Sequence, residues 1–170
     1  MQRIICGLCI GFMATLASYA ALAQSPAAIP DKMPFDIPIG TSIGLAQAKE
    51  LLPVAEAEAR KHDWKMAIAV VDTAGELVAF EKMDGTQMSS VTIAINKAHT
   101  SARFRRATSV FFEAMEKGHA SVATLDPRLV ASPGGIPLVE NGKLIGAIGC
   151  SGGTGGQDAI VCNAAASKVH

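Results

Sequence analysis

Two β-hairpin signals, separated by helical segments, constrain the fold of this chain more than any other feature of its sequence. The first consists of the apolar runs 66–71 and 77–80, joined by a turn that ends at Gly75. The second is Asn141-Gly142 between two apolar runs in 138–148, and Asn-Gly in that setting is a strong hairpin signal. Because a hairpin pairs its strands antiparallel, we predict an α+β fold: an antiparallel sheet of two hairpins with helices packed on it.

Helical periodicity fills the rest of the domain. Apolar residues recur every three or four positions in 44–61, where Pro53 should kink the helix, and again in 88–102. A shorter helix is predicted for 108–117, and a last one should follow the glycine-rich loop 151–156 and end near Lys168. The segment 121–133 is predicted to be irregular.

The first 23 residues have the outline of a secretory signal peptide. Arg3 precedes an apolar stretch, and Ala21-Leu22-Ala23 is the small-x-small pattern that signal peptidase accepts, which predicts cleavage before Gln24. The alternative is an uncleaved membrane anchor, because the apolar run approaches the roughly 20 residues that a spanning helix needs. We expect a periplasmic or secreted protein that is not attached to the membrane after cleavage, with a proline-rich arm at 24–40 and one domain at 41–170.

The charge of the chain restricts the classes of partner that it can bind. The chain has 15 basic and 15 acidic residues with no long run of either sign, which argues against nucleic acid or an anionic membrane as a partner.

Cys150 and Cys162 follow the signal peptide, and an oxidising compartment permits them to form a disulfide. Two buried thiols in the core are the alternative, and the sequence favours that reading slightly.

Four ordered sequence blocks resemble the GlcG/HbpS-like family, also called the haem-degrading domain family. The resemblance extends over residues 41–168 and rests on these blocks: AIAVVDTAGELVAFEKMDG (67–85), NKAHTSA (96–102), GGIP (134–137) and IGAIGCSGG (145–153), with Asp158 after the last. The resemblance implies a homo-oligomer that binds haem or a related tetrapyrrole without a covalent bond, in an accessory or sensing role. Family membership alone does not establish catalysis.

His99 is the first candidate for a ligand to haem iron. It lies in one of the matching blocks, on the predicted polar face of the second helix, one turn from Asn96 and Arg103. These three residues are predicted to contribute to the cofactor site. The competing interpretation is a solvated helix histidine with no ligand role.

Lys97 and Thr108 complete the candidate site. Lys97 could pair with a carboxylate of the ligand, such as a haem propionate, or instead form a salt bridge with Asp72 or Asp84. The resemblance implies Thr108 as an oxygen ligand. We expect a pocket between the sheet and the helix that carries Lys97 and His99.

The glycine-rich loop supports a different class of function. Consecutive backbone N–H groups before a helix can bind a carboxylate, although the glycines can also simply permit a tight turn, with Asp158 as a helix cap. An enzyme or accessory subunit that acts on a small carboxylic acid, through Lys97, Asp72 and this loop, is therefore the alternative function. No nucleophile with an attendant base is recognisable. A purely structural interaction module would need neither Lys97 nor His99.

Overall fold

The structure is a computed structural model that describes residues 30–33 and 35–170. The predicted signal peptide and the arm as far as residue 29 lie outside the described residues. A compact unit extends from Met33 to His170. Within the described part of the chain, no helix is both long and apolar enough to cross a membrane.

The elements follow the predicted order. The strands are β1 (Ala67–Val71), β2 (Leu77–Lys82), β3 (Gly135–Glu140) and β4 (Lys143–Ser151). The helices are α1 (Leu45–Lys61), α2 (Ser90–Phe104), α3 (Ser109–Glu116) and α4 (Gly155–Ala166), with a short 3-10 turn at Ala120–Thr124. The 3-10 turn lies at the start of the segment that was predicted to be irregular.

The four described strands form one antiparallel sheet in the order β2-β1-β4-β3. Each hairpin supplies two neighbouring strands, and the hairpins meet where β1 pairs with β4. Pro137 lies on β3, at the edge of the sheet, where a missing N–H donor is tolerated. The α+β architecture predicted from the two hairpins is confirmed.

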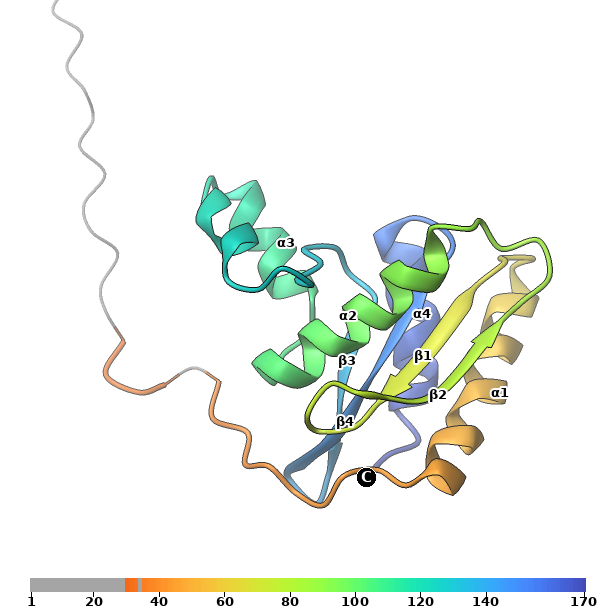
Figure 1. The fold of residues 1–170 in the computed structure, drawn as a ribbon, viewed down its shortest axis with the longest axis horizontal. Coiled ribbons are helices and arrows are strands. Elements are labelled where there is room, and N and C mark those ends of the chain that lie inside the picture. Colours follow the sequence, from red (N-terminus) through yellow and green to blue (C-terminus); the bar gives the residue numbers. More distant parts are fainter. Residues whose placement is uncertain (1–29, 34) are drawn as a thin grey trace, which may run out of the picture. The chain divides into compact units, whose positions relative to one another are not determined.

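Helices cover both faces of the sheet (Figure 1). On one face α1 and α4 pack over a core of larger side chains that includes Ile68, Val70 and Ile148. On the other face α2 packs over a cluster of mostly small residues: Ala67, Ala69, Val71 and Ala147 from the sheet, and Ala94, Ala98 and Ala102 from the helix. Because both sides are small, α2 lies very close to the sheet.

Gly149 of β4 shows how close this approach is. A Cβ atom at that position would lie 2.2 Å from the carbonyl oxygen of Ala94 and 2.5 Å from the amide nitrogen of Ala98. No side chain larger than hydrogen fits there without a shift of the helix. The position of α2, and of every functional group on it, is therefore set by backbone contact with β4.

Cys150 and Cys162 form a disulfide between β4 and α4, so the interpretation of two free thiols is wrong. The two half-cystines are completely buried. The sequence left the choice open because nothing in the spacing of two cysteines shows that the end of a strand and the middle of the next helix come together.

The described part of the proline-rich arm packs on its own domain. The guanidinium of Arg106 lies 3.5 Å from the centroid of the Phe35 ring, and Arg105 donates a hydrogen bond to the carbonyl oxygen of Ile37 at 2.9 Å. Ile39 then forms a parallel bridge to Leu144 of β4. Residues 35–39 are thus held by the domain that follows them.

Candidate functional site

The side chain of His99 projects from α2 to the turn between β1 and β2. Its Nδ1 atom lies 3.1 Å from the carbonyl oxygen of Gly75. Since a carbonyl only accepts hydrogen bonds, Nδ1 carries the proton and the lone pair of the neutral ring is on Nε2. The turn therefore fixes both the orientation and the tautomer of this imidazole.

The turn holds Gly75 in place by local contacts. The Oδ1 atom of Asp72 accepts hydrogen bonds from the backbone N–H groups of Ala74 and Glu76, at 2.8 and 2.9 Å. Gly75 has a φ angle of +86°, and a Cβ atom there would lie 2.8 Å from Nδ1 of His99 and 3.1 Å from Cγ of Arg103. Only glycine satisfies the backbone conformation and leaves room for the two side chains of α2.

A second segment lies over the other side of the imidazole. We call residues 126–130 the covering segment. The Oδ2 atom of Asp126 is 3.8 Å from Nε2 of His99, and the His99 side chain is only 6% exposed. The competing interpretation of His99 as a solvated helix histidine is therefore wrong, because a turn and a loop that are distant in sequence cover it.

The covering segment also contacts Asn96 and Thr100. Arg128 Nε donates to Oδ1 of Asn96 at 3.2 Å, and the N–H of Val130 donates to Oγ1 of Thr100 at 3.0 Å. Asn96, His99 and Arg103 thus belong to one group, arranged along α2 between the β1–β2 turn and the covering segment. The predicted grouping of these three residues agrees with their positions, while their role as ligands stays a prediction.

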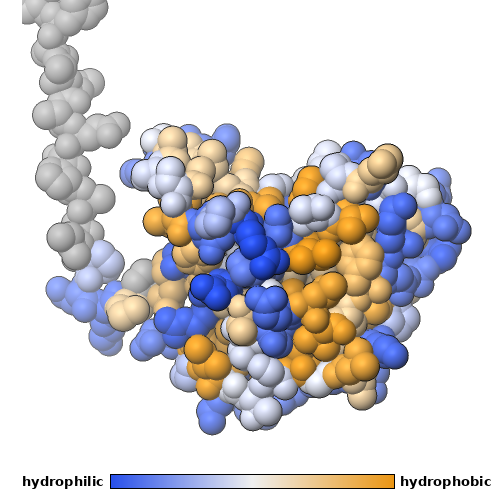
Figure 2. Space-filling view, in the orientation of Figure 1, coloured by the Kyte–Doolittle hydropathy of each residue, from blue (hydrophilic) through white to orange (hydrophobic). Residues whose placement is uncertain are grey.

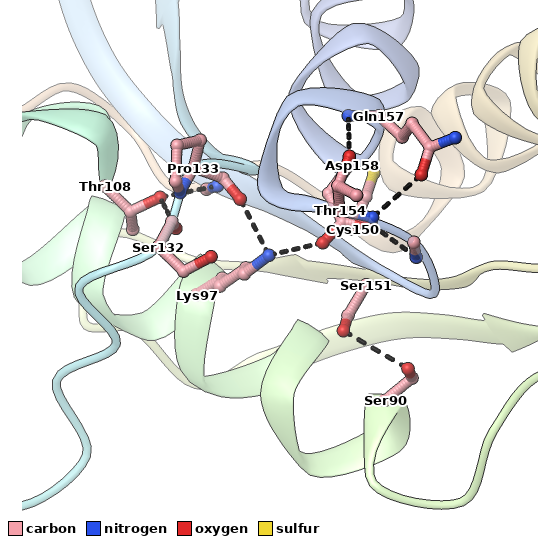
Figure 3. Close-up of polar contacts among 12 residues, drawn as sticks. Ser90, Lys97, Thr108, Ser132, Pro133, Cys150, Ser151, Thr154, Gln157 and Asp158 are labelled. Atoms are coloured by element: carbon pink, nitrogen blue, oxygen red, sulfur yellow. Dashed lines mark hydrogen bonds and ion pairs between the residues drawn. The ribbon is translucent and has the colours of Figure 1, made fainter. Parts of the chain in front are cut away.

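Lys97 and Thr108 belong to a second group on another side of α2 (Figure 3). The ammonium of Lys97 donates to Oδ2 of Asp158 at 2.6 Å and to the carbonyl oxygen of Pro133 at 2.7 Å. The Lys97 side chain is 2% exposed and that of Asp158 3%. The alternative salt bridge of Lys97 with Asp72 or Asp84 is wrong, because the partner comes from α4.

Burial lowers the pKa of Lys97, and the hydrogen bond and charge of Asp158 oppose that shift. Asp158 also accepts a hydrogen bond from the N–H of Gly153 at 3.0 Å, and Gln157 accepts one from the N–H of Thr154 at 2.8 Å. These two amides of the glycine-rich loop are therefore already bound to the chain's own side chains. Asp72 lies in the β1–β2 turn instead, so the proposed carboxylic acid site does not assemble.

The hydroxyl group of Thr108 also takes part in two hydrogen bonds within the domain, one as donor and one as acceptor. Its Oγ1 donates to the carbonyl oxygen of Ser132 at 2.7 Å and accepts from the N–H of Gly135 at 2.9 Å. The residue has no exposed surface. In this conformation Thr108 connects the start of α3 to β3, and its predicted role as an oxygen ligand would require both hydrogen bonds to break.

The expected pocket that contains both Lys97 and His99 is not formed. Two surface hollows of about 480 Å³ each lie elsewhere in the described domain, one between α1 and α4 and one beside the β3–β4 turn. The two side chains leave α2 in different directions, each into a close-packed polar contact. Within the described residues, no group of three or more His, Cys, Asp or Glu side chains could hold a metal ion.

The surface around His99 combines polar and apolar character. Phe80 of β2 and Ile95 of α2 are half-buried and pack against the small-residue cluster under α2. Figure 2 shows a broad hydrophobic area on this face, next to a cluster of hydrophilic residues. Arg103 and His99 both lie against Gly75, and Arg128 bonds to Asn96 one turn before His99, so two cations lie near the imidazole.

Sequence reasoning missed the partners that make this site. Gly75, Asp126 and Arg128 were not candidates, although Gly75 lies in a matching block and so gave some signal. Nothing in the sequence indicated that the covering segment lies over His99, because that region was predicted only to be irregular. Its contacts with α2 depend on the path of a loop that has no periodic pattern.

Comparison with known proteins gives a consistent result. A family model described as "Haem degrading protein HbpS-like" matches residues 43–167. An uncharacterized 15.0 kDa protein from the dhaT-dhaS intergenic region of Citrobacter freundii is 35% identical over 127 residues, which are 73% of this chain and 89% of that protein. Protein GlcG of Escherichia coli K12 is 39% identical over 113 residues, 65% of this chain and 84% of GlcG.

Solved structures share the fold. The Klebsiella pneumoniae protein ORFY superposes with a TM-score of 0.72 at 26% identity, covering 83% of this chain and 96% of ORFY. The PduOC structure, which is a complex with haem, gives a TM-score of 0.70 at 23% identity and covers 76% of this chain and 96% of that one.

Proposed function

Since the chain belongs to the HbpS-like haem-degrading protein family, we propose that it binds haem non-covalently with Nε2 of His99 as the ligand to iron. One observation carries this proposal. The Nδ1–H group of His99 points at the carbonyl oxygen of Gly75, which leaves the Nε2 lone pair for a metal. Histidines that bind metals usually donate their other ring N–H to a carbonyl or carboxylate in this way.

Tyrosine, cysteine and the other histidines are less suited than His99 to bind haem iron in this chain. The only tyrosine is Tyr19, in the predicted signal peptide, and both cysteines of the domain are joined in a disulfide. Of the remaining histidines, His62, His119 and His170 are exposed. His99 is the one buried histidine of the described domain, and its ring is oriented by a hydrogen bond.

The side chains around His99 suit a porphyrin once the covering segment has moved off Nε2. Arg103 and Arg128 can form charge-assisted hydrogen bonds with propionate groups, and Phe80 and Ile95 offer apolar contact to the ring. When bound, the haem would supply an iron centre, and the chain's residues would bind and orient it. A structural relative that was crystallised with haem shares this fold, which further supports the proposal.

Hemin titration of the mature chain, which is expected to start at Gln24, tests the proposal. The wild-type protein should give a saturable shift of the Soret band. His99→Ala should change the Soret position and weaken binding by more than the roughly tenfold that loss of an outer-shell partner costs. His119→Ala is the matched control, because His119 is exposed and takes part in none of the contacts described above, and it should leave both quantities unchanged.

Two results would contradict the proposal in different ways. If His99→Ala keeps the wild-type spectrum and affinity, another group holds the iron. If wild-type protein binds hemin no more tightly than an unrelated apolar protein, haem is not the ligand.

We also propose that the protein is exported to the periplasm or secreted. The signal-peptide pattern supports this, and so does the Cys150–Cys162 disulfide, because such bonds persist in oxidising compartments. Mass spectrometry of protein from the periplasmic or culture fraction should find Gln24 as the first residue. An intact N-terminus in the membrane fraction would favour the uncleaved anchor instead. A homo-oligomer also stays a prediction, which light scattering of the same sample can check.

A further inference from the structure

We propose that Asp72 is a positioning residue for His99, and that it acts through the peptide group between Gly75 and Glu76. This inference rests on the proposed haem site, because it assigns an outer partner to the same imidazole. The N–H of this peptide group, which belongs to Glu76, donates to Oδ1 of Asp72 at 2.9 Å. Its carbonyl oxygen, which belongs to Gly75, lies 3.1 Å from Nδ1 of His99.

The peptide group couples these two hydrogen bonds. It is trans, so its N–H and C=O point in opposite directions within one plane. A rotation that breaks the bond to Asp72 therefore also turns the carbonyl oxygen of Gly75 away from His99. The two bonds form a chain from a carboxylate to an imidazole, in which each bond polarises the next. Asp72 thus holds the carbonyl oxygen in place and makes it a better acceptor.

The rest of the turn does not fix the plane of this peptide group. The pairing of β1 with β2 shifts its register next to the turn, so the strand ladder does not set the direction of the Gly75 carbonyl. The N–H of Asp72 donates to the carbonyl oxygen of Glu76 at 2.9 Å, which closes the base of the turn. Inside the turn, Oδ1 of Asp72 is the acceptor for the N–H groups of Ala74 and Glu76.

An outer partner of this kind changes the properties of a metal ligand. A histidine that donates its other ring N–H to a carbonyl or carboxylate is fixed in orientation and binds the metal more strongly. The partner of His99 is a carbonyl that is itself linked to a carboxylate. Loss of Asp72 should therefore weaken the imidazole as an iron ligand and raise the reduction potential of bound haem.

Two substitutions at Asp72 separate its two effects. Asp72→Asn keeps an acceptor oxygen and removes the charge, whereas Asp72→Ala removes both. The domain should stay folded in either variant, because Ala74 and Glu76 are exposed and their N–H groups can bond to water instead. Asp84→Ala is the control, since it removes an exposed carboxylate that follows β2 at the other end of the hairpin.

Nitrogen NMR of the His99 ring in the protein without hemin tests the positioning. At about pH 9, where a histidine ring is neutral, the wild-type protein should carry the ring proton on Nδ1. Asp72→Ala should give a mixture of the two neutral tautomers, because the carbonyl of Gly75 is no longer held. Asp72→Asn and Asp84→Ala should keep the wild-type tautomer.

Hemin binding tests the consequence for the proposed function. Asp72→Ala should weaken hemin binding by about tenfold, the lower end of the loss that follows removal of an outer-shell partner. The midpoint potential of the bound haem should rise from the wild type to Asp72→Asn and rise further in Asp72→Ala. A residue that only stabilised the turn would lower the melting temperature without ordering the potentials in this way.

The outcomes separate this inference from the haem proposal. A wild-type tautomer in Asp72→Ala, or a mixture in Asp72→Asn, would overturn the positioning role whatever the protein binds. Equal potentials in Asp72→Asn and the wild type would overturn the part played by the charge. If His99→Ala shows that the imidazole is not the ligand while the tautomers respond as expected, the haem assignment fails and the positioning role remains.

Circular dichroism shows whether Asp72→Ala folds. If it does not, Asp72→Ser replaces it, because a serine hydroxyl can bond the same backbone N–H groups more weakly. Asp72→Ser should then show a tautomer mixture, and a pure wild-type tautomer in this variant would equally overturn the positioning role.

Discussion

Lys97 and Asp158 form an ion pair with almost no access to solvent, and such pairs are sensitive to the loss of one partner. The isolated charge that remains cannot regain its hydration inside the domain. The pair joins α2 to the first turn of α4, and the carbonyl oxygen of Pro133 binds the same ammonium. We therefore assign Lys97 a structural role in this conformation.

Lys97→Ala should lower the free energy of unfolding by about 3–5 kcal/mol, because it leaves the Asp158 carboxylate buried without its partner. The double variant Lys97→Met/Asp158→Leu should recover a large part of that loss, since no buried charge remains. Urea denaturation followed by circular dichroism measures both values.

Lys65→Ala is the matched control for that experiment. Lys65 pairs with Asp63 at the surface, with side chains that are 46% and 90% exposed, so the loss should stay below about 1 kcal/mol. If Lys97→Ala costs no more than Lys65→Ala, the buried pair does not stabilise the domain as argued here.

At the scale of elements, the contact of α2 with the sheet is the feature that places the candidate site. The centre of the interface is formed mostly by alanine side chains and by Gly149, so the helix backbone lies against the strand backbone there. This arrangement brings His99 within reach of the β1–β2 turn. A larger residue under α2 would lift the helix and separate His99 from Gly75.

Gly149→Ala should therefore destabilise the domain by about 1–3 kcal/mol, the usual cost of overpacking a core. It should also weaken hemin binding, if His99 is the ligand. Gly156→Ala is the control, since a Cβ atom there would meet nothing nearer than 4.0 Å and alanine favours a helix. Thermal unfolding of Gly149→Ala and Gly156→Ala measures the stability of both variants. Equal stability of Gly149→Ala and the wild type would show that α2 can shift at no cost.

The elements themselves were predictable from local pattern. Short apolar runs with turn residues between them identified both hairpins, and helical spacing identified α1 and α2. The start of α2 was the main difference: it begins at Ser90, and Met88 before it is 89% exposed. Met88 continued the apolar spacing by chance, which periodicity alone cannot detect.

At the scale of the whole molecule, the site could be predicted only in part. Lys97 and His99 were expected to line one pocket between the sheet and the helix that carries both residues, which are two positions apart. In an α-helix that spacing turns the side chains to different sides, so one meets α4 and the other meets the β1–β2 turn. Their partners Asp158, Gly75 and Asp126 come from three separate loops or helix starts. No sequence pattern predicts that these residues lie close to Lys97 or His99.

The buried disulfide sets an order of events in the maturation of this protein. Neither sulfur can be reached from solvent once α4 lies on the sheet, because both half-cystines have no exposed surface. An oxidant must therefore act on Cys150 and Cys162 while the C-terminal helix is still undocked. Chains that complete folding among reductants would bury two thiols beyond the reach of any later oxidation, so we expect delivery to an oxidising environment to precede the last step of assembly.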